Sequence, residues 1–95
     1  MHKVEVIKRA VCRQFNIPLQ SIESATRKAN VVRPRQIAMY LVRKHTEHSY
    51  AEIGRRLGGR DHTTILHAFH KISNLRERDG AVAAQLESLE ASIFA

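Results

Sequence analysis

One stretch of the sequence, GGRDHTTILHAFHKI at residues 58–72, holds the residue types that are best suited to chemistry. A glycine pair is followed by a carboxylate, an imidazole and two hydroxyl groups, just before an apolar run with helical spacing. These polar side chains are Asp61, His62, Thr63 and Thr64. Such side chains could cap the helix, hold a metal ion or transfer protons, or contact a ligand at the helix end.

The histidines give little support to metal binding or acid–base catalysis. Of His62, His67 and His70, only the last two share a helical face within one turn. His45 and His48 lie in a different segment. No H-E-x-x-H motif occurs, and no cysteine or group of carboxylates accompanies the histidines. A histidine-based metal protein or enzyme is therefore a remote alternative, and we expect no catalytic or metal site.

The start of this helix fits contacts to DNA bases as well as capping. Asp61 stands at the N-cap position, and Thr63 and Thr64 could simply complete the first turn. The same groups also match base edges, since a carboxylate accepts from cytosine N4 and a threonine methyl packs on the thymine methyl. Glycines allow the backbone to approach a phosphate, and the free N–H groups of a helix start favour an anion. Four polar groups together favour base recognition over capping alone.

Positive charge is concentrated in the segment before this helix. The chain has a formal net charge of +7, and nine basic but only two acidic residues lie between Arg27 and Arg60. The flanking segments nearly cancel in charge. Charge gathered in one region points to a polyanionic partner, most simply nucleic acid, and the alternative is a basic surface that only confers solubility.

Helical spacing of apolar residues runs through the whole chain and predicts a compact all-α domain of about six helices. Residues 3–15 form a first amphipathic helix, and Pro18 begins a short second helix that ends near Glu23. Residues 24–32 have no clear period and predict a basic loop. Pro34 should lie near the first turn of the third helix, where a missing N–H is tolerated.

Residues 49–75, approximately, predict a helix-turn-helix. Ser49 and Glu52 form a capping-box pattern, in which each side chain bonds the backbone N–H of the other residue. The glycine pair at 58–59 ends this short helix, and Asp61 caps the next one.

The last predicted helix carries an apolar stripe that could face either the domain itself or a second protein. The stripe consists of Val82, Leu86, Leu89 and Ile93. At this length it should close the domain's own core. If it paired with another helix instead, a dimer on paired sites and a repressor-like role would be favoured over a monomer on one asymmetric site.

The single cysteine, Cys12, excludes an internal disulfide and fits a reducing compartment. Its apolar neighbours indicate a buried, inert thiol. No apolar run approaches the roughly 20 residues that cross a bilayer, and the N-terminus has no signal-peptide pattern. We therefore expect a cytoplasmic protein with no membrane partner.

The sequence RPRQIAMYLVRKHTEHSYAEIGRRL, followed directly by GGRDHTTILHAFHKI, resembles the C-terminal DNA-binding domain of the bacterial replication initiator DnaA. The resemblance runs through residues 27–75, and the flanking helices fit the same domain in length and order, so that residues 1–95 form a single domain of this kind. It implies a Trp-repressor-like helical fold. It also implies binding of double-stranded DNA at the DnaA box of a replication origin, a short asymmetric element with the consensus TTATCCACA, and a nucleoid-associated location.

The resemblance further implies roles for individual residues. Contacts to bases in the major groove are implied for Asp61, His62, Thr63 and Thr64. A contact in the adjacent minor groove is implied for Arg27. Contacts to the phosphate backbone are implied for Arg35, Gln36, Arg43, Tyr50, Arg60 and Lys71. The sequence departs from the family at Leu57, where many members have phenylalanine, and in the basic loop, whose fewer positive charges should weaken minor-groove binding.

The phosphate-loop motif G-x-x-x-x-G-K-[ST] does not occur, so the nucleotide-binding module of the full initiator is absent from this sequence. No cofactor or small-molecule substrate is expected. The chain would be either an excised domain or a stand-alone relative.

The competing functions are a stand-alone transcriptional regulator, or a competitor of the initiator, with the same helix-turn-helix. Non-specific nucleoid or RNA binding ranks third, because few aromatic residues are available to stack on bases.

Overall fold

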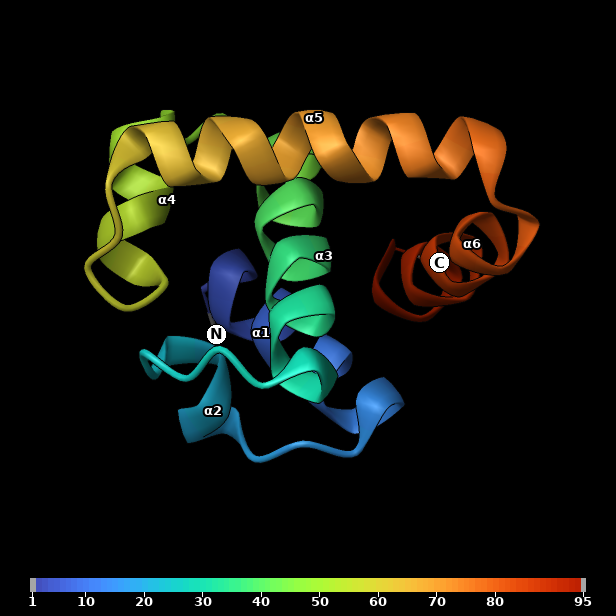
Figure 1. Cartoon of the computed structure of the whole chain (residues 1–95), viewed down its shortest axis with the longest axis horizontal. Coiled ribbons are helices and arrows are strands. Elements are labelled where there is room, and N and C mark those ends of the chain that lie inside the picture. The colour runs from blue at the N-terminus through green and yellow to red at the C-terminus, as the bar shows by residue number, and fades with distance from the viewer. Residues whose placement is uncertain (1, 95) are drawn as a thin grey trace.

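The computed structural model of the chain describes residues 2–94, which form six α-helices and no strand (Figure 1). The helices are α1 (Lys3–Phe15), α2 (Leu19–Glu23), α3 (Ala29–His45), α4 (Tyr50–Arg56), α5 (His62–Arg78) and α6 (Gly80–Phe94). The predicted all-α class, the six helices and the helix-turn-helix, formed by α4 and α5, are confirmed.

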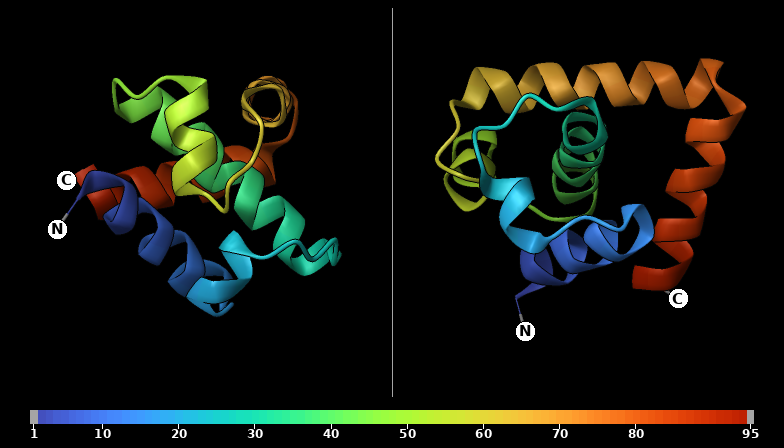
Figure 2. Two further views of the ribbon diagram at one scale, coloured as in Figure 1. Left: turned by 90° about the vertical axis from the view of Figure 1, so that its left-hand side faces the viewer. Right: turned by 60° about the horizontal axis from the view of Figure 1, so that its bottom comes forward.

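The long helix α3 forms the centre of the molecule. It packs against α1, α2, α4 and α5, and α5 crosses it (Figures 1 and 2). Its inward residues Ile37, Leu41 and Val42 have no exposed surface. Apolar burial of this kind is the main favourable contribution to the stability of the fold.

The helices α4 and α6 lie at opposite ends of α5 (Figures 1 and 2). Val82, Leu86 and Leu89 of α6 are at most 4% exposed, and Ile93 packs against the same core. The apolar stripe of the last helix therefore closes the domain's own core, as predicted, against α1 and α5. The thiol of Cys12 is also buried, and burial raises its pKa.

The third helix begins earlier than the sequence pattern predicts. It starts at Ala29, so Pro34 is its sixth residue rather than a residue of its first turn. Proline has no N–H to donate to the carbonyl four residues earlier, which disfavours this position by roughly 3 kcal/mol. Val31 and Pro34 are nevertheless both buried, and their packing against the domain outweighs the lost hydrogen bond. The connecting loop is consequently only residues 24–28.

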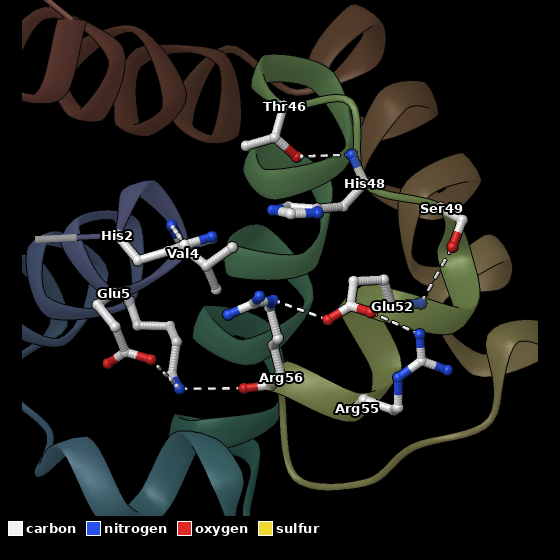
Figure 3. A network of polar contacts seen from close by, with 10 residues as sticks. His2, Val4, Glu5, Thr46, His48, Ser49, Glu52, Arg55 and Arg56 are labelled. Atoms are coloured by element: carbon white, nitrogen blue, oxygen red, sulfur yellow. Dashed lines mark hydrogen bonds and ion pairs between the residues drawn. The ribbon is translucent and has the colours of Figure 1, made fainter.

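The start of α4 has one half of the predicted capping box. The hydroxyl of Ser49 accepts from the backbone N–H of Glu52 at 3.2 Å. The carboxylate of Glu52 does not reach back to Ser49. It accepts from Arg55 at 2.5 Å and from Arg56 at 2.9 Å (Figure 3). Charge-assisted bonds to guanidinium groups are stronger than a bond to a neutral amide, and they lower the pKa of Glu52.

No helix within residues 2–94 has both the length and the apolar character needed to cross a membrane.

Candidate nucleic-acid interface

The polar side chains at the start of α5 are all exposed to solvent. Asp61 is the N-cap residue, and its carboxylate accepts from the backbone N–H of Thr63 at 3.3 Å. It also lies 2.9 Å from Nδ1 of His62, and both side chains are about two-thirds exposed. His62, Thr63 and Thr64 occupy the first turn. Capping by Asp61 is confirmed, and it leaves the outer face of the carboxylate accessible to a ligand.

Three glycines allow the sharp connection between α4 and α5. Gly58 and Gly59 have φ values of 90° and 71°, in the left-handed region that side chains disfavour. Gly54 lies inside α4, and its carbonyl accepts from the N–H of Arg60 at 2.8 Å. A Cβ at Gly54 would overlap the backbone of Arg60, and one at Gly58 would overlap the carbonyl of Glu23. A glycine inside a short helix just before a glycine turn was the sequence signal for this close approach.

The loop of residues 24–28 lies close to the helix-turn-helix. Figure 2 shows the turn between α4 and α5 dipping toward α2, which directly precedes this loop. A single hollow is lined by Thr26 and Arg27 of the loop, by Gly58 and Arg60 of the turn, and by Thr64 of α5. The side chain of Arg27 is exposed. The tertiary structure thus brings Arg27 and the first turn of α5 to one face of the molecule.

A second hollow runs between α3 and α5. Gln36 of α3 and Lys71 of α5 both line it, together with Thr64 and the exposed His67. A lysine, an amide and a hydroxyl in one groove can all donate hydrogen bonds to phosphate oxygens. His67 lines the groove, whereas His70 is exposed and does not.

Arg35, for which the resemblance implies a phosphate contact, is a buried side chain with internal partners. It is only 7% exposed, and its guanidinium donates to backbone carbonyls of α2 and of the loop. The acceptors are the carbonyl oxygens of Ser21 (3.1 Å), Ile22 (3.0 Å), Ser24 (3.0 Å) and Thr26 (3.0 Å). A guanidinium has five N–H groups, so only one is left for an external ligand. Burial, with a smaller contribution from nearby Arg60, lowers the pKa of Arg35. In this structure Arg35 is an internal anchor of the loop.

Arg60, Arg43 and Tyr50 are half-buried and also make internal contacts. Arg60 donates to the carbonyl of Leu57 at 2.5 Å and to the carbonyl of Ser24. Arg43 donates to the carbonyl of His48 at 3.0 Å, and its guanidinium lies 4.2 Å from the centre of the Tyr50 ring. Arg43 and Tyr50 therefore form one cluster where α3 ends and α4 begins.

The histidines are dispersed over the surface. His2 and His48 stack on each other, with ring centres 5.2 Å apart (Figure 3), and His45 contacts Glu90 at 2.8 Å. Within residues 2–94, no group of three or more His, Cys, Asp or Glu side chains is arranged to hold a metal ion.

The family model and the relatives that match this chain all carry the same protein name. Residues 4–72 match the family described as the bacterial DnaA protein helix-turn-helix. The chain is 53% identical over 88 residues to the chromosomal replication initiator protein DnaA of Rhodopseudomonas palustris (strain BisA53), an alignment that covers 93% of this chain and 19% of that protein. The proteins of the same name from Bradyrhizobium sp. (strain ORS 278) and Nitrobacter hamburgensis are 53% and 51% identical, with 93% of this chain and 18% of theirs covered. The chain thus spans about a fifth of the length of these relatives.

Proposed function

Because the chain belongs to the bacterial DnaA helix-turn-helix family, which supplies the DNA-binding domain of DnaA, we propose that it binds the DnaA box, a duplex resembling TTATCCACA. In this proposal α5 enters the major groove by its N-terminus, and the loop of residues 24–28 inserts Arg27 into the adjacent minor groove. The relatives are named chromosomal replication initiator proteins. As part of the proposal, we extend a role in replication initiation and a nucleoid-associated location to this chain.

The base contacts are assigned to the exposed first turn of α5. Asp61 accepts from a cytosine amino group, and His62 donates or accepts on a neighbouring base edge. The methyl groups of Thr63 and Thr64 pack against thymine methyl groups, which suits the T-rich end of the box. The exposure of all four side chains supports this assignment.

The phosphate contacts are assigned to both sides of the groove between α3 and α5. Lys71 and Gln36 line it together, so one strand of the duplex can lie between them. Arg43 and Tyr50 would contact the backbone at the start of α4, and Arg60 at the turn. Arg35 is assigned an indirect role, since it holds the loop that carries Arg27.

The observation that carries the proposal is the shared hollow lined by Arg27 and Thr64. These residues belong to two segments that are far apart in sequence, and both grooves of one duplex have to be contacted from one face of the protein. A minor-groove arginine beside the start of a recognition helix meets that requirement.

Fluorescence anisotropy tests the proposal directly. The chain is titrated into a labelled duplex that contains TTATCCACA and, separately, into a scrambled duplex of equal length, each across a salt series up to physiological ionic strength. We expect the box to be preferred by ~10³-fold or more. Equal affinity for the two duplexes, with equal salt dependence, would reduce the function to non-specific DNA binding.

A further inference from the structure

A buried lysine, Lys8, connects three helices. Lys8 of α1 is only 2% exposed, although lysine is rarely buried without partners. Its amine contacts the carboxylate of Glu5 at 3.1 Å, the carboxylate of Glu23 at 2.5 Å and the carbonyl oxygen of Arg56 at 3.0 Å. The three donors of the ammonium group are thereby matched by three acceptors. Figure 3 shows the Glu5 carboxylate and the Arg56 backbone on opposite sides of the gap that this amine bridges.

Two of these partners are the last residues of their helices. Glu23 ends α2 and directly precedes the loop that carries Arg27. Arg56 ends α4 and precedes the glycine turn that leads into α5. One amine therefore fixes the starting points of both segments that the proposed function brings to DNA. Glu5, by contrast, lies on the same helix as Lys8 and connects no further element.

A second contact joins the same two segments one residue further along. The carbonyl of Ser24 accepts from Arg60 of the turn and from Arg35 of α3. The separation between loop and turn is thus fixed by two sets of contacts, those of Lys8 with Glu23 and Arg56 and those of the two guanidinium groups with Ser24.

We propose that Lys8 is a positioning residue for DNA recognition, which sets the separation between Arg27 and the first turn of α5. This inference rests on the proposed function. The two grooves of a duplex lie at a fixed spacing, so a loop already held at that spacing loses less conformational freedom on binding. Lys8 itself touches no DNA, and its effect on affinity acts through Arg27.

A double-mutant cycle separates positioning from simple stabilisation. Lys8→Met keeps an unbranched apolar stem of similar length and removes the amine. Its effect on affinity for the TTATCCACA duplex is measured in the wild-type chain and in the Arg27→Ala chain, well below each melting temperature. We expect a loss of about tenfold in the wild-type background and of about twofold or less without Arg27, because the two residues act as a unit. The matched control Glu5→Met removes a carboxylate partner that leads to neither segment, and it should change affinity by less than about twofold.

The outcomes are distinguishable. If the wild-type chain does not prefer the box over the scrambled duplex, the proposed function fails before Lys8 is tested. If it does, equal losses in the two backgrounds, or no loss at all, overturn the positioning role. If circular dichroism shows that Lys8→Met does not fold, Glu23→Met replaces it in the cycle, because it cuts only the link to the loop. An additive result with that variant overturns the proposal as well.

Discussion

Arg60 donates from Nη2 to the backbone carbonyl of Ser24, 36 residues earlier in the chain. This bond joins the turn of the helix-turn-helix to the loop that carries Arg27. Because Arg35 donates to the same carbonyl at 3.0 Å, a single acceptor ties α3, the loop and the turn together. The two proposed DNA-contacting segments are therefore held together before any DNA is bound. Arg35 and Arg60 hold these segments in place, in addition to carrying positive charge.

Removing the imidazole at the start of α5 should reduce sequence preference. His62→Ala is expected to weaken binding to the box by roughly 1–3 kcal/mol and to leave binding to random duplex nearly unchanged, because a base contact is lost. Anisotropy titrations on both duplexes measure the difference. His70→Ala is the control, since it changes an exposed histidine of the same helix that does not line the groove. Equal losses on the two duplexes would exclude a base contact for His62.

Removing the lysine of the α3–α5 groove should weaken all DNA binding. Lys71→Ala is expected to lower affinity for box and scrambled duplexes alike, and to reduce the slope of log affinity against log salt by about one unit. Lys3→Ala removes an exposed lysine of α1, away from this groove, and should leave the slope unchanged. An unaltered slope in Lys71→Ala would argue against a phosphate contact.

The internal contacts of Arg35 change what its removal should do. Arg35→Ala removes four hydrogen bonds to backbone carbonyls, and we expect the free energy of unfolding to fall by about 3 kcal/mol. Urea denaturation measures this loss. Below the melting temperature the salt dependence of binding should match that of the wild type. A flatter salt dependence with unchanged stability would restore the direct phosphate role.

A methyl group should not be accommodated at position 54, inside α4. Gly54→Ala places a Cβ on the backbone of Arg60, and we expect a destabilisation of about 1–3 kcal/mol together with weaker box binding. Gly80→Ala is the matched control, because nothing lies within 4 Å of a Cβ at that position. It should be neutral or stabilising by up to about 1 kcal/mol. Thermal unfolding gives the melting temperatures of the two variants. Similar melting temperatures would contradict the close contact at Gly54.

The ion pair between α5 and α6 should make the stability of the fold depend on pH in the acidic range. Arg76 donates to Glu90 at 2.6 Å and lowers the pKa of that carboxyl from its ordinary 4.5 to about 2, assisted by His45. A lowered pKa in the folded state stabilises the fold above pH 4.5, and this contribution is lost as the pH falls toward 2. Glu90→Gln should therefore reduce stability at pH 7 by on the order of 1–3 kcal/mol and flatten its dependence between these pH values. Urea denaturation across that range measures both effects, and parallel pH curves would contradict the pair's contribution.

The sequence by itself determined the helices and the helix-turn-helix, and it predicted the polar first turn of α5 that we propose contacts DNA. Caps such as Asp61, the glycine turn and the spacing of apolar residues are local signals, which act over three or four positions. They predicted α1, α5 and the core-facing stripe of α6 correctly, and they placed the polar first turn of α5. The start of α3 was predicted too late, because Pro34 is a strong local signal and the burial that overrides it is not local.

Only the tertiary structure decided which charged side chains face inward. Arg35 and Lys8 each lie on a helix whose pattern leaves a polar residue free to point to solvent. The acceptors that bury them are 9 to 14 residues away for Arg35 and up to 48 residues away for Lys8. Apart from Glu5, which lies on the same helix as Lys8, those acceptors are backbone carbonyls and the carboxylate of Glu23 at the end of α2. They reach Arg35 and Lys8 only once α1, α2, α3 and α4 have packed. A charged side chain can be buried when packing brings hydrogen-bond acceptors to it. The spacing of apolar residues along the chain cannot predict such contacts, because the acceptors are distant in sequence.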